Sequence, residues 1–581
     1  MKARVVRRAL PAAAPILNEA ALHPVLRRVY AARGITAIEQ LDQRLTRLAD
    51  PVLLGGLDHA CALLAAAIVA QQSILIVGDF DADGATGTAV AIRGLGLLGA
   101  QRVAFRVPNR AIHGYGLSPA LVAELALAPP QLLITVDNGI ACHAGVQAAL
   151  ALGCRVIITD HHVPGSQLPA ADAVVNPNLP GDGFPSKALA GVGVMFYLLL
   201  ALRAHLRGSD FFSTERPEPD LSVLLDLVAI GTVADLVPLD FNNRVLVAAG
   251  LRRIQAGRAA IGVNAIIRAA GRDPARIDAA DLGFVVGPRI NAAGRLEDMS
   301  IGIHCLLSES AEQAQILAAR LDGINAERRG VQAEMVAEAE AWLQHFHPDH
   351  AQLPPALCLF DATWHPGVIG LVASRIKDRV HRPTIAFAPA ATDGRELRGS
   401  ARSIPGLHLR DALAAVDARH PGWILKFGGH AMAAGLSLQR QHFDRFAAAF
   451  AEVVRERVDP AWLEALLYSD GTLADDDCDL ALACALRAGG PWGQGFPEPL
   501  FDGEFQIESA RLLGTRHLAL KLRCCQSARV FEAVHFGAFT GQLPSGRWHY
   551  AYQVQVDEWR NQHRLRLLIR QALPVLAATA S

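Results

Sequence analysis

The sequence lacks the features of a secreted, disulfide-bonded or membrane-spanning protein. Its nine cysteines are scattered and odd in number, and no CxxC pair occurs, so neither a disulfide framework nor a thiolate zinc site is expected. The longest strongly apolar run, residues 188–202, has 15 residues, whereas a membrane-spanning helix needs about 20. Residues 1–15 contain no apolar segment of the kind that a signal peptide needs. We therefore expect a soluble, cytoplasmic protein with no membrane partner.

An excess of charge of one sign is also missing. The chain has 55 Lys and Arg against 56 Asp and Glu, a net charge of −1, so any nucleic-acid surface must be a local patch. With 51% hydrophobic residues the chain can build real cores, which excludes a disordered scaffold. Its 581 residues correspond to roughly three to four domains.

Short apolar runs alternate with helix-length segments in the first half of the chain. The runs are residues 74–77, 103–107, 132–136, 155–159 and 173–175. Continuous apolar runs of this length are typical of buried parallel strands, because helices cover both faces of such a sheet. The fold class predicted for residues 1–305 is therefore α/β, with a doubly wound, mainly parallel sheet and an N-terminal extension. After it, a helix is expected at 221–230 and a turn at 231–235.

The second half of the chain predicts three further parts. Residues 308–344 contain no proline and are rich in Ala, Glu, Gln and Arg, so 306–345 is expected to be a long connecting helix, interrupted at most near Gly323 and Gly330. A second, smaller α/β domain is expected at 346–459. Five strand-like runs between 503 and 569 predict a C-terminal β-barrel of the OB type within 460–581.

Acidic residues follow the predicted strands at their carboxyl ends. In an open parallel sheet these ends share one edge, so the side chains are expected to converge there. A single aspartate after a strand is usually a helix N-cap. An EF-hand loop is excluded because Val90 occupies the twelfth position, where a glutamate is required. Clustered carboxylates repel one another unless cations are present, so the set predicts a metal centre: Asp79, Asp81, Asp83, Asp137, Asp160, His161, His162 and Asp235.

Carboxylates with one or two imidazoles suit two Mn²⁺ or Mg²⁺ ions, and the histidines favour Mn²⁺. Two such ions about 3.5–4 Å apart activate a water molecule and stabilise both oxygens of a phosphoryl transfer. Asp137, alone after the central strand, is the candidate for a bridging carboxylate. The predicted reaction is hydrolysis of a phosphate ester or anhydride.

Several motifs carry a resemblance to a known family. GDFDADG (78–84), VDNG (136–139), TDHH (159–162) and GTVADL (231–236) occur in the order that resembles the DHH phosphoesterase superfamily. The segments 287–295, 364–370, 399–403 and 427–430 look like those of its bacterial single-strand-specific 5′→3′ exonucleases, and the resemblance extends over nearly the whole chain. It implies that the metal ligands are Asp79, Asp81, Asp83, Asp137, His161 and Asp235. Which of the first three contact metal directly stays open.

The resemblance also implies roles for residues around the metals. Asp160 would orient His161. His162 would face the scissile phosphate, so that His162, Asp160 and Asp137 are the predicted catalytic residues. Substrate contacts are expected from Arg110, Arg289, Asn291, Arg295, Ser400, Arg402, Gly428, Gly429 and His430, with forked guanidinium groups holding the terminal phosphate. One departure from the family pattern is Ala401, which stands where a glycine is usual; its methyl group would weaken the contact only if a backbone amide there approaches phosphate closely, and this effect stays open.

The predicted barrel has its own nucleic-acid signal. Residues 505–570 contain ten Arg and Lys but four Asp and Glu, a net charge of +6 in an otherwise neutral chain. Basic residues beside aromatic rings are what sequence-tolerant single-strand binding requires. The aromatic residues are Phe531, Phe536, Trp548, Tyr550, Tyr552 and Trp559, of which at least three are expected in the barrel core.

Together with the predicted metal centre and basic barrel, the resemblance implies a metal-dependent 5′→3′ exonuclease that degrades single-stranded DNA to 5′-mononucleotides in DNA repair and recombination. The resemblance suggests a monomer, with a single-strand-binding protein and a helicase as partners. One alternative is a phosphodiesterase or pyrophosphatase of the same superfamily acting on small substrates, which would not need a basic barrel. Another is a non-catalytic single-strand-binding protein, which would not need the full set of acidic residues.

Overall fold

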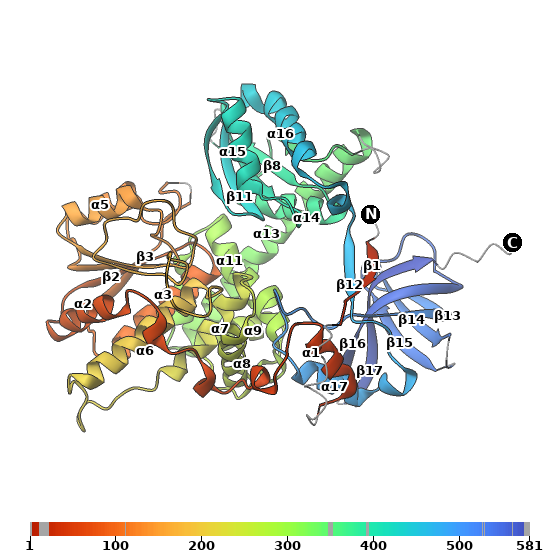
Figure 1. The fold of residues 1–581 in the computed structure, drawn as a ribbon, viewed down its shortest axis with the longest axis horizontal. Coiled ribbons are helices and arrows are strands. Elements are labelled where there is room, and N and C mark those ends of the chain that lie inside the picture. Colours follow the sequence, from red (N-terminus) through yellow and green to blue (C-terminus); the bar gives the residue numbers. More distant parts are fainter. Residues whose placement is uncertain are drawn as a thin grey trace. The chain divides into compact units, whose positions relative to one another are not determined.

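The structure is a computed structural model that describes residues 3–10, 22–110, 112–346, 353–390, 394–525, 527, 529–559 and 562–574. It divides into two compact units. The N-terminal unit comprises Pro11–Asn325 and Ala485–Glu498. The C-terminal unit comprises Met1–Leu10, Ala326–Cys484 and Pro499–Ser581 (Figure 1).

A five-stranded parallel sheet forms the centre of the N-terminal unit, which confirms the predicted fold class. Its strand order is β3-β2-β4-β5-β6, and each neighbouring pair is parallel. Every residue of β2 and β4 is buried, as the continuous apolar runs indicated. The strands are β2 (Ile74–Gly78), β3 (Val103–Arg106), β4 (Leu132–Val136), β5 (Arg155–Thr159) and β6 (Ala173–Val175).

Helices cover both faces of this sheet. Leu75 and Val77 of β2 share a hydrophobic core with Leu121 of α4 (Pro119–Ala123) and Val146 of α5 (His143–Ala151). On the opposite face, α3 (Ala82–Leu97) lies so close to β4 that a Cβ on Gly87 would be 2.6 Å from the Val136 side chain. Helices α2 (Leu57–Val69) and α6 (Gly191–Gly208) also pack on this side. The sheet is therefore doubly wound, and the edge at the carboxyl ends of its strands is covered by loops instead of helices.

A helical layer follows the sheet, and here one prediction is wrong. The expected turn at 231–235 is helical, because α7 (Leu225–Ala234) continues to Ala234 and Asp235 is its C-cap. Gly231 allows this close packing, since a Cβ there would lie 2.3 Å from Thr86 Oγ1 of α3. Burial thus outweighs the low helix propensity of glycine. The other elements are η5 (Leu221–Leu224), α8 (Phe241–Gln255), α9 (Ile261–Ala269), α10 (Ala279–Asp281), the π-helix η7 (Leu282–Val286), α11 (Gly287–Leu296) and α12 (Ser300–Leu307).

Short helices precede the sheet. Helix α1 (Pro24–Ala31) packs with the returning segment Ala485–Glu498, where Tyr30 donates a hydrogen bond to the carbonyl oxygen of Gly489 at 2.8 Å. The 3₁₀ turns of this unit are η2 (Ile38–Leu41), η3 (Leu45–Arg47), η4 (Pro51–Leu53) and η6 (Pro274–Arg276). The segment 485–498 thus contributes to the N-terminal unit although it lies late in the sequence.

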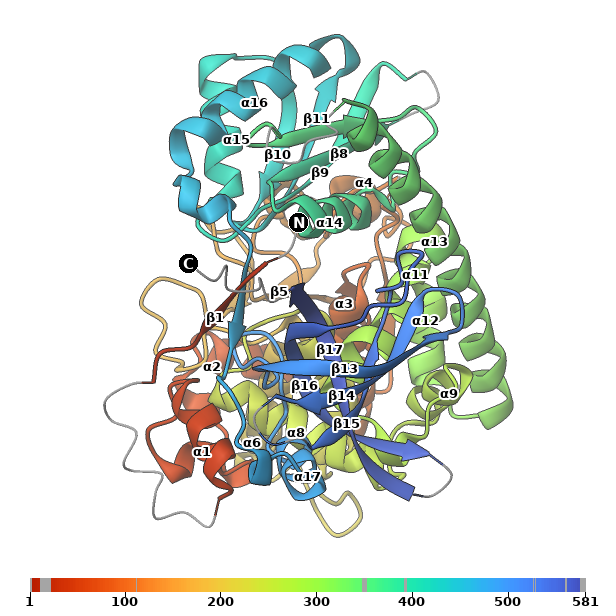
Figure 2. The ribbon, with the colours of Figure 1, turned by 90° about the vertical axis from the view of Figure 1, so that its right-hand side faces the viewer.

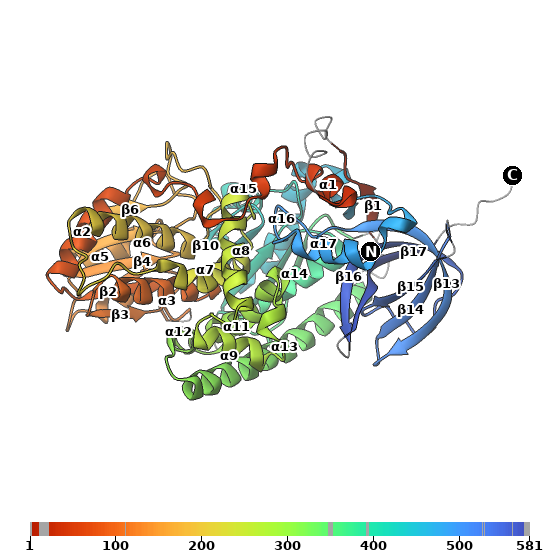
Figure 3. The same cartoon turned by 90° about the horizontal axis from the view of Figure 1, so that it is seen from below.

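Helix α13 (Ala311–Phe346) has 36 residues and begins in the N-terminal unit (Figure 3). It confirms the expected long helix, and neither Gly323 nor Gly330 interrupts it. The Ala, Glu, Gln and Arg residues around these two glycines have high helix propensity, which offsets the cost of about 1 kcal/mol for each glycine.

The C-terminal unit contains a second α/β domain. Its mixed sheet has the order β10-β11-β9-β8-β7, in which β7 and β8 are parallel and the other pairs antiparallel. The strands are β7 (Leu357–Phe360), β8 (Thr384–Pro389), β9 (Glu396–Arg402), β10 (Ile424–Gly429) and β11 (Ala433–Gln439). Its helices are α14 (Ile369–Val380), α15 (Leu409–Arg419) and α16 (Phe443–Arg457), with η9 (Arg440–His442) before α16 and η10 (Pro460–Leu463) after it.

A closed five-stranded barrel completes this unit and confirms the OB-type prediction (Figure 2). The strands follow the order β13-β14-β15-β17-β16, with β15 and β17 parallel. The N-terminal strand β1 (Arg4–Arg7) pairs in parallel with β12 (Leu466–Ser469). The barrel strands are β13 (Phe501–Leu513), β14 (His517–Cys524), β15 (Val530–His535), β16 (Arg547–Trp559) and β17 (Gln562–Pro574), preceded by η11 (Asp475–Asp477) and α17 (Leu480–Ala488).

Within the described ranges, no single helix has the length and apolar character to cross a membrane. One bent pair, Leu45–Leu53 with Leu57–Val69, meets those criteria by length and composition alone. All nine cysteines are free thiols.

Candidate metal centre

The predicted acidic residues converge at the carboxyl edge of the parallel sheet. Asp79, Asp137 and Asp160 follow β2, β4 and β5 directly. Among the described residues there are three groups of side chains in each of which the ligand atoms lie within 4.8 Å of one another. These groups are Asp79, Asp81 and Asp137; Asp83, His161 and Asp235; and Asp137, His161 and His162.

Asp137 and His161 join these groups into one centre. The Nε2 atom of His161 lies 3.1 Å from Asp137 Oδ1, 3.5 Å from Asp235 Oδ2 and 4.0 Å from Asp83 Oδ2. Asp137 adopts a left-handed backbone conformation, with φ of 63°. Gly191 lies so close to it that a Cβ on Gly191 would be 2.5 Å from the Cβ of Asp137. The close approach of Gly191 therefore fixes the position of the Asp137 carboxylate between the groups.

The three aspartates of the first loop have different surroundings. Asp81 caps α3 by accepting a hydrogen bond from the N–H of Gly84 at 3.0 Å. Asp83 accepts backbone hydrogen bonds on both oxygens, from Gly191 at 2.6 Å and Val192 at 2.9 Å. Asp79 Oδ1 is buried and accepts no hydrogen bond from the described residues. Of the three, Asp79 has the carboxylate oxygen most open to a cation.

The electrostatics of the cluster also favour a cation. Burial, followed by the negative charge of neighbouring aspartates, raises the pKa values of Asp79, Asp137 and Asp235 well above the usual range. The same causes raise the pKa of Asp83 to about 7. Divalent cations remove this repulsion, and carboxylates with one imidazole are a donor set that Mn²⁺ and Mg²⁺ accept. The residues at this edge therefore fit a divalent metal centre.

Asp160 holds the ring of His162 and also binds the backbone of His161, the residue that it was predicted to orient. Its Oδ1 accepts hydrogen bonds from His162 Nδ1 at 2.7 Å and from the backbone N–H of His161 at 2.7 Å. The compact turn brings the ring of the second histidine, not the first, back onto the carboxylate. Burial lowers the pKa of His162, but the hydrogen bond and charge of Asp160 outweigh this and raise it to about 9. Burial raises the pKa of Asp160, but the contacts with His162 outweigh it and lower the pKa.

Aromatic and amide side chains that the sequence did not single out complete the centre. The hydroxyl of Tyr115 donates to the carbonyl oxygen of Asp137 at 3.2 Å, and its ring meets His162 edge-on. Asn176 and Asn178 donate to the carbonyl oxygens of His162 and His161. The sequence could have indicated Tyr115 through its two flanking glycines, Gly114 and Gly116, which are typical of a tight loop. In the structure both glycines have positive φ. No such indication exists for the asparagines, because their partners lie on another loop.

The structure places four predicted substrate residues in this unit. Arg110 lies 4.1 Å from the centre of the Phe80 ring, and its positive charge opposes in part the burial and the charge of Asp81 that raise the pKa of Asp79. Asn291 Oδ1 accepts the N–H of Ala82 at 2.8 Å, which ties α11 to the start of α3. Arg289 is paired with Asp322, and Arg295 is half-buried on the same helix. Arg110 and α11 therefore contact Phe80 and Ala82, which lie in the first acidic segment of the metal centre.

The other predicted substrate residues belong to the C-terminal unit. Cross-strand pairing puts Ser400, Gly435 and Gly428 in one row across β9, β11 and β10. Arg402 Nη1 donates to Ser400 Oγ at 3.1 Å, and β10 ends at Gly429, followed by the exposed His430. A Cβ on Gly370, at the start of α14, would lie 2.9 Å from both Ser400 Oγ and Arg402 Nη2. This row is thus a compact polar patch beside a helix N-terminus.

Ala401 does not disturb this patch. Its side chain is fully buried in the hydrophobic core beside Leu436 and Ile385, whereas Ser400 and Arg402 are partly exposed. Successive side chains of a strand point to opposite faces. The methyl group therefore lies on the core face of the sheet, opposite the side chains of Ser400 and Arg402.

In the barrel, three of the six aromatic residues are core residues, as expected. Phe531, Tyr550 and Tyr552 are buried. Phe536 is exposed by 57%, and Trp548 is partly exposed. The side chain of Trp559 lies outside the described residues.

A doubly wound sheet with a buried acidic and histidine cluster at its edge, followed by a long helix and a second α/β domain, defines a protein of the DHH class. Family models agree: the DHH family N-terminal domain matches residues 73–232, the DHHA1 domain 354–456 and the RecJ OB domain 469–571. The chain belongs to the RecJ family.

Relatives and solved structures agree with this assignment. The chain is 49% identical to the single-stranded-DNA-specific exonuclease RecJ of Dickeya dadantii, over 95% of this chain and 96% of that protein. It is 46% identical to the same-named protein of Escherichia coli, over 96% and 97%. The crystal structure of RecJ in complex with Mn²⁺ from Thermus thermophilus matches with a TM-score of 0.80 at 31% identity, covering 99% of this chain and 80% of that one.

Proposed function

We propose that this protein is a metal-dependent exonuclease that degrades single-stranded DNA from its 5′ end and releases 5′-mononucleotides. The observation that carries the proposal is the buried cluster joined by Asp137 and His161. It is supported by relatives named single-stranded-DNA-specific exonuclease at 46–49% identity, and by similar RecJ structures that hold Mn²⁺ or Mg²⁺. Mn²⁺ or Mg²⁺ is accordingly the proposed cofactor.

The cluster offers two ligand sets that share no residue and are joined by a third set made of Asp137, His161 and His162. Asp79, Asp81 and Asp137 form one set, and Asp83, His161 and Asp235 form the other. Asp137 lies 3.1 Å from His161 and is positioned to bridge two ions. When bound, the two ions supply an activated water and neutralise charge on the attacking and leaving oxygens. Asp83, held on both oxygens by backbone N–H groups of α6, contributes a rigidly oriented carboxylate.

His162 is proposed to act on the scissile phosphate. Asp160 accepts a hydrogen bond from Nδ1 of His162, and this leaves Nε2 of the ring to face the substrate. Because its pKa is raised to about 9, the ring stays protonated near neutral pH. A protonated Nε2 neutralises charge on the phosphate and donates a proton to the leaving oxygen. Asp160 thus acts as the positioning residue for this proton donor.

Arginines are proposed to hold the 5′ end. Arg110 is close enough to the cluster for its charge to oppose the burial that raises the pKa of Asp79. Arg289, Asn291 and Arg295 lie on α11, which contacts the start of α3 beside the loop of Asp79 and Asp81. Forked guanidinium groups suit a terminal phosphate better than ammonium groups. In the C-terminal unit, the proposed strand contacts are Ser400, Arg402, Gly428, Gly429 and His430.

The barrel is proposed to bind the single strand through its basic charge and exposed rings. Phe536 and Trp548 are accessible for stacking on bases. A cytoplasmic location, in DNA repair and recombination, is consistent with nine free cysteines. We also propose a monomer that cooperates with a single-strand-binding protein and a helicase.

Digestion of an oligonucleotide labelled at its 3′ end tests the proposal. Single-stranded and blunt duplex substrates are compared in Mn²⁺, Mg²⁺ and chelator. We expect a ladder that shortens from the 5′ end, with metal and on the single strand alone. Tight binding without digestion would indicate a binding protein instead. Neither binding nor digestion would point to small phosphodiester or pyrophosphate substrates.

A further inference from the structure

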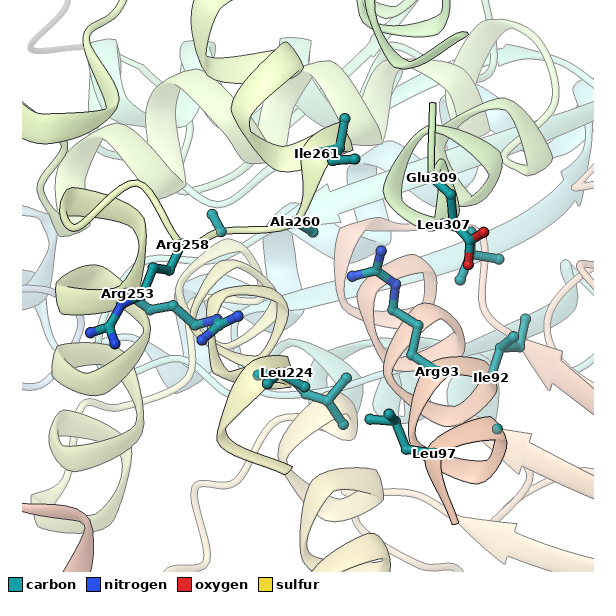
Figure 4. Close-up of a pocket in the computed structure, with 13 residues that line it drawn as sticks. Ile92, Arg93, Leu97, Leu224, Arg253, Arg258, Ala260, Ile261, Leu307 and Glu309 are labelled. Atoms are coloured by element: carbon teal, nitrogen blue, oxygen red, sulfur yellow. The ribbon is translucent and has the colours of Figure 1, made fainter. Parts of the chain in front are cut away.

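The N-terminal unit contains a pocket apart from the metal centre (Figure 4). Its volume is about 610 Å³. Small-molecule sites usually measure about 300–1,000 Å³ and combine an apolar lining with a few polar groups. The apolar wall of this pocket includes Leu97, Leu224, Ile261 and Leu307. Its size and lining are those of a small-molecule site.

Three arginines from separate segments surround the pocket. Arg93 extends from α3 on one side, and Arg253 and Arg258 approach from α8 and the loop after it on the other (Figure 4). Within the described part of the chain, the guanidinium groups of Arg93 and Arg258 make no hydrogen bond or ion pair with a protein side chain or carbonyl group. Two arginines on one side and one on the other give the pocket a positive lining, which favours an anionic ligand, and the fork of a guanidinium group matches phosphate.

Arg253 is paired with a buried carboxylate, that of Asp226. Asp226 is fully buried, its Oδ1 lies 3.9 Å from Arg253 Nε, and its Oδ2 accepts the N–H of Ala260 at 2.6 Å. This pair leaves the outer nitrogens of Arg253 for a ligand. The other acidic residue at the pocket is Glu309, so three positive charges face two negative ones. The net charge of the pocket remains positive.

A helix N-terminus adds to this positive end. Ala260 and Ile261, at the start of α9, line the pocket; the N-cap residue Ala260 has no side chain that could cap the helix, and its own N–H is bound by Asp226. The first N–H groups of a helix lack partners within the helix and attract anions. A phosphate placed among the arginines would lie near this end of α9, while a flat apolar group would rest on the aliphatic wall.

The pocket is distinct from the metal centre but shares two helices with it. Arg93 follows Asp83 on α3 by ten residues, which is about 15 Å along a helix. Asp226 precedes Asp235 on α7 by nine residues, about 13 Å. A ligand in this pocket would thus bind beyond the reach of the metal ligands.

We propose that this pocket binds a nucleoside 5′-monophosphate, with its phosphate among Arg93, Arg253 and Arg258 and its base on the aliphatic wall. The choice of a nucleotide rests on the proposed function, whose reaction releases that compound. The phosphate-binding character rests on the arginines alone. The pocket would then be a second site for the product, separate from the site where it forms.

Calorimetric titration of the full-length protein in chelator tests the proposal without requiring turnover. The probes are dAMP, deoxyadenosine and inorganic phosphate. We expect one dAMP per chain, with at least tenfold weaker binding of deoxyadenosine and of phosphate. Arg93→Ala, on the half-exposed face of α3, should weaken dAMP at least tenfold. Arg268→Ala, on α9 but outside the pocket, removes the same charge and should leave dAMP binding unchanged.

Several results would overturn the proposal. One is the absence of dAMP binding at millimolar concentration, and another is equal binding by the wild type and Arg93→Ala. Equally tight binding of inorganic phosphate would overturn the nucleotide assignment. Arg253→Lys, which keeps a charge beside Asp226, provides a second variant if Arg93→Ala does not fold. The oligonucleotide digestion described above is measured separately, so a failure of the proposed function is distinguishable from a failure of this site.

Discussion

Arg289 and Asp322 form a close pair inside the N-terminal unit, with Nη2 and Nε of the guanidinium 2.8 and 2.9 Å from one carboxylate oxygen. The remaining nitrogen, Nη1, donates to the carbonyl oxygen of Val285 at 2.8 Å. Asp322 thus occupies the fork of the guanidinium that is proposed to hold a 5′-phosphate. A phosphate that binds there must displace this carboxylate.

Replacing the competing carboxylate should therefore tighten substrate binding. We expect Asp322→Asn to bind a 5′-phosphorylated single strand about fivefold more tightly, since a partly exposed ion pair contributes about 1 kcal/mol. Fluorescence anisotropy in chelator measures this against a 5′-hydroxyl strand, whose affinity should not change. Asp298→Asn, which removes an acidic group bonded to Ser300, is the matched control. An equal gain for both strands would refute a specific role of Arg289 at the 5′ end.

The variant Asp137→Asn distinguishes a loss of turnover from a loss of single-strand binding. Asparagine tolerates the left-handed backbone of this position, so the fold should persist. Loss of the bridging charge should reduce turnover by at least about 100-fold, because metal ions contribute several kcal/mol. Binding of the single strand in chelator should stay nearly unchanged. Asp172→Asn, whose carboxylate accepts the N–H of Val156, should keep full activity, and equal loss of turnover and binding in Asp137→Asn would contradict its role.

Asp160→Asn should shift the pH dependence of turnover. The folded protein raises the pKa of His162, so a step that needs its protonated ring proceeds below that pKa and is lost as the pH rises through it. Removing the negative charge of Asp160 lowers this pKa. The alkaline limb of a kcat profile should move to lower pH by about one unit or more. His162→Gln should remove the limb, and an unmoved limb in Asp160→Asn would refute the assignment.

The sequence predicted the framework better than the contacts within it. The runs at 132–136 and 155–159 coincide with β4 and β5, because strands buried on both faces read as continuous apolar segments. The position of Asp235 was predicted, but its helix was not, since Gly231 is tolerated in α7 only through its packing on α3. Local patterns contain no information on such tertiary packing.

The same limit applies to the candidate site. That the acidic residues converge follows from their place after parallel strands. The pairing of Asp160 with His162 instead of His161 depends on a single turn of the chain, and the pairing of Arg289 with Asp322 joins positions far apart in the sequence. Neither carries a sequence signal. The direction of the Ala401 side chain was likewise set by the register of β9, which becomes known only with its neighbours.

The exposed ring of Phe536 gives a test of the barrel. Phe536→Ala should weaken single-strand binding by about 1–3 kcal/mol, the usual contribution of a stacked base. Leu512→Ala is the matched control, because Leu512 is an exposed apolar residue of the same barrel without a ring. Binding is measured by anisotropy over a range of salt concentrations. The salt dependence should be the same for both variants, since neither changes a charge. Equal losses of affinity in the two would argue against stacking.

The path of the chain limits how the protein can be dissected. Because Met1–Leu10 and Pro499–Ser581 belong to one unit and Ala485–Glu498 to the other, the backbone passes between the units four times. No single cleavage therefore releases either unit with all its segments. A truncation that removes residues 460–581 with the barrel also removes the partner of β1 and the segment that packs on Tyr30. Protease resistance of one unit would consequently depend on intact connections to the other, and point substitutions will separate their activities more cleanly than fragments.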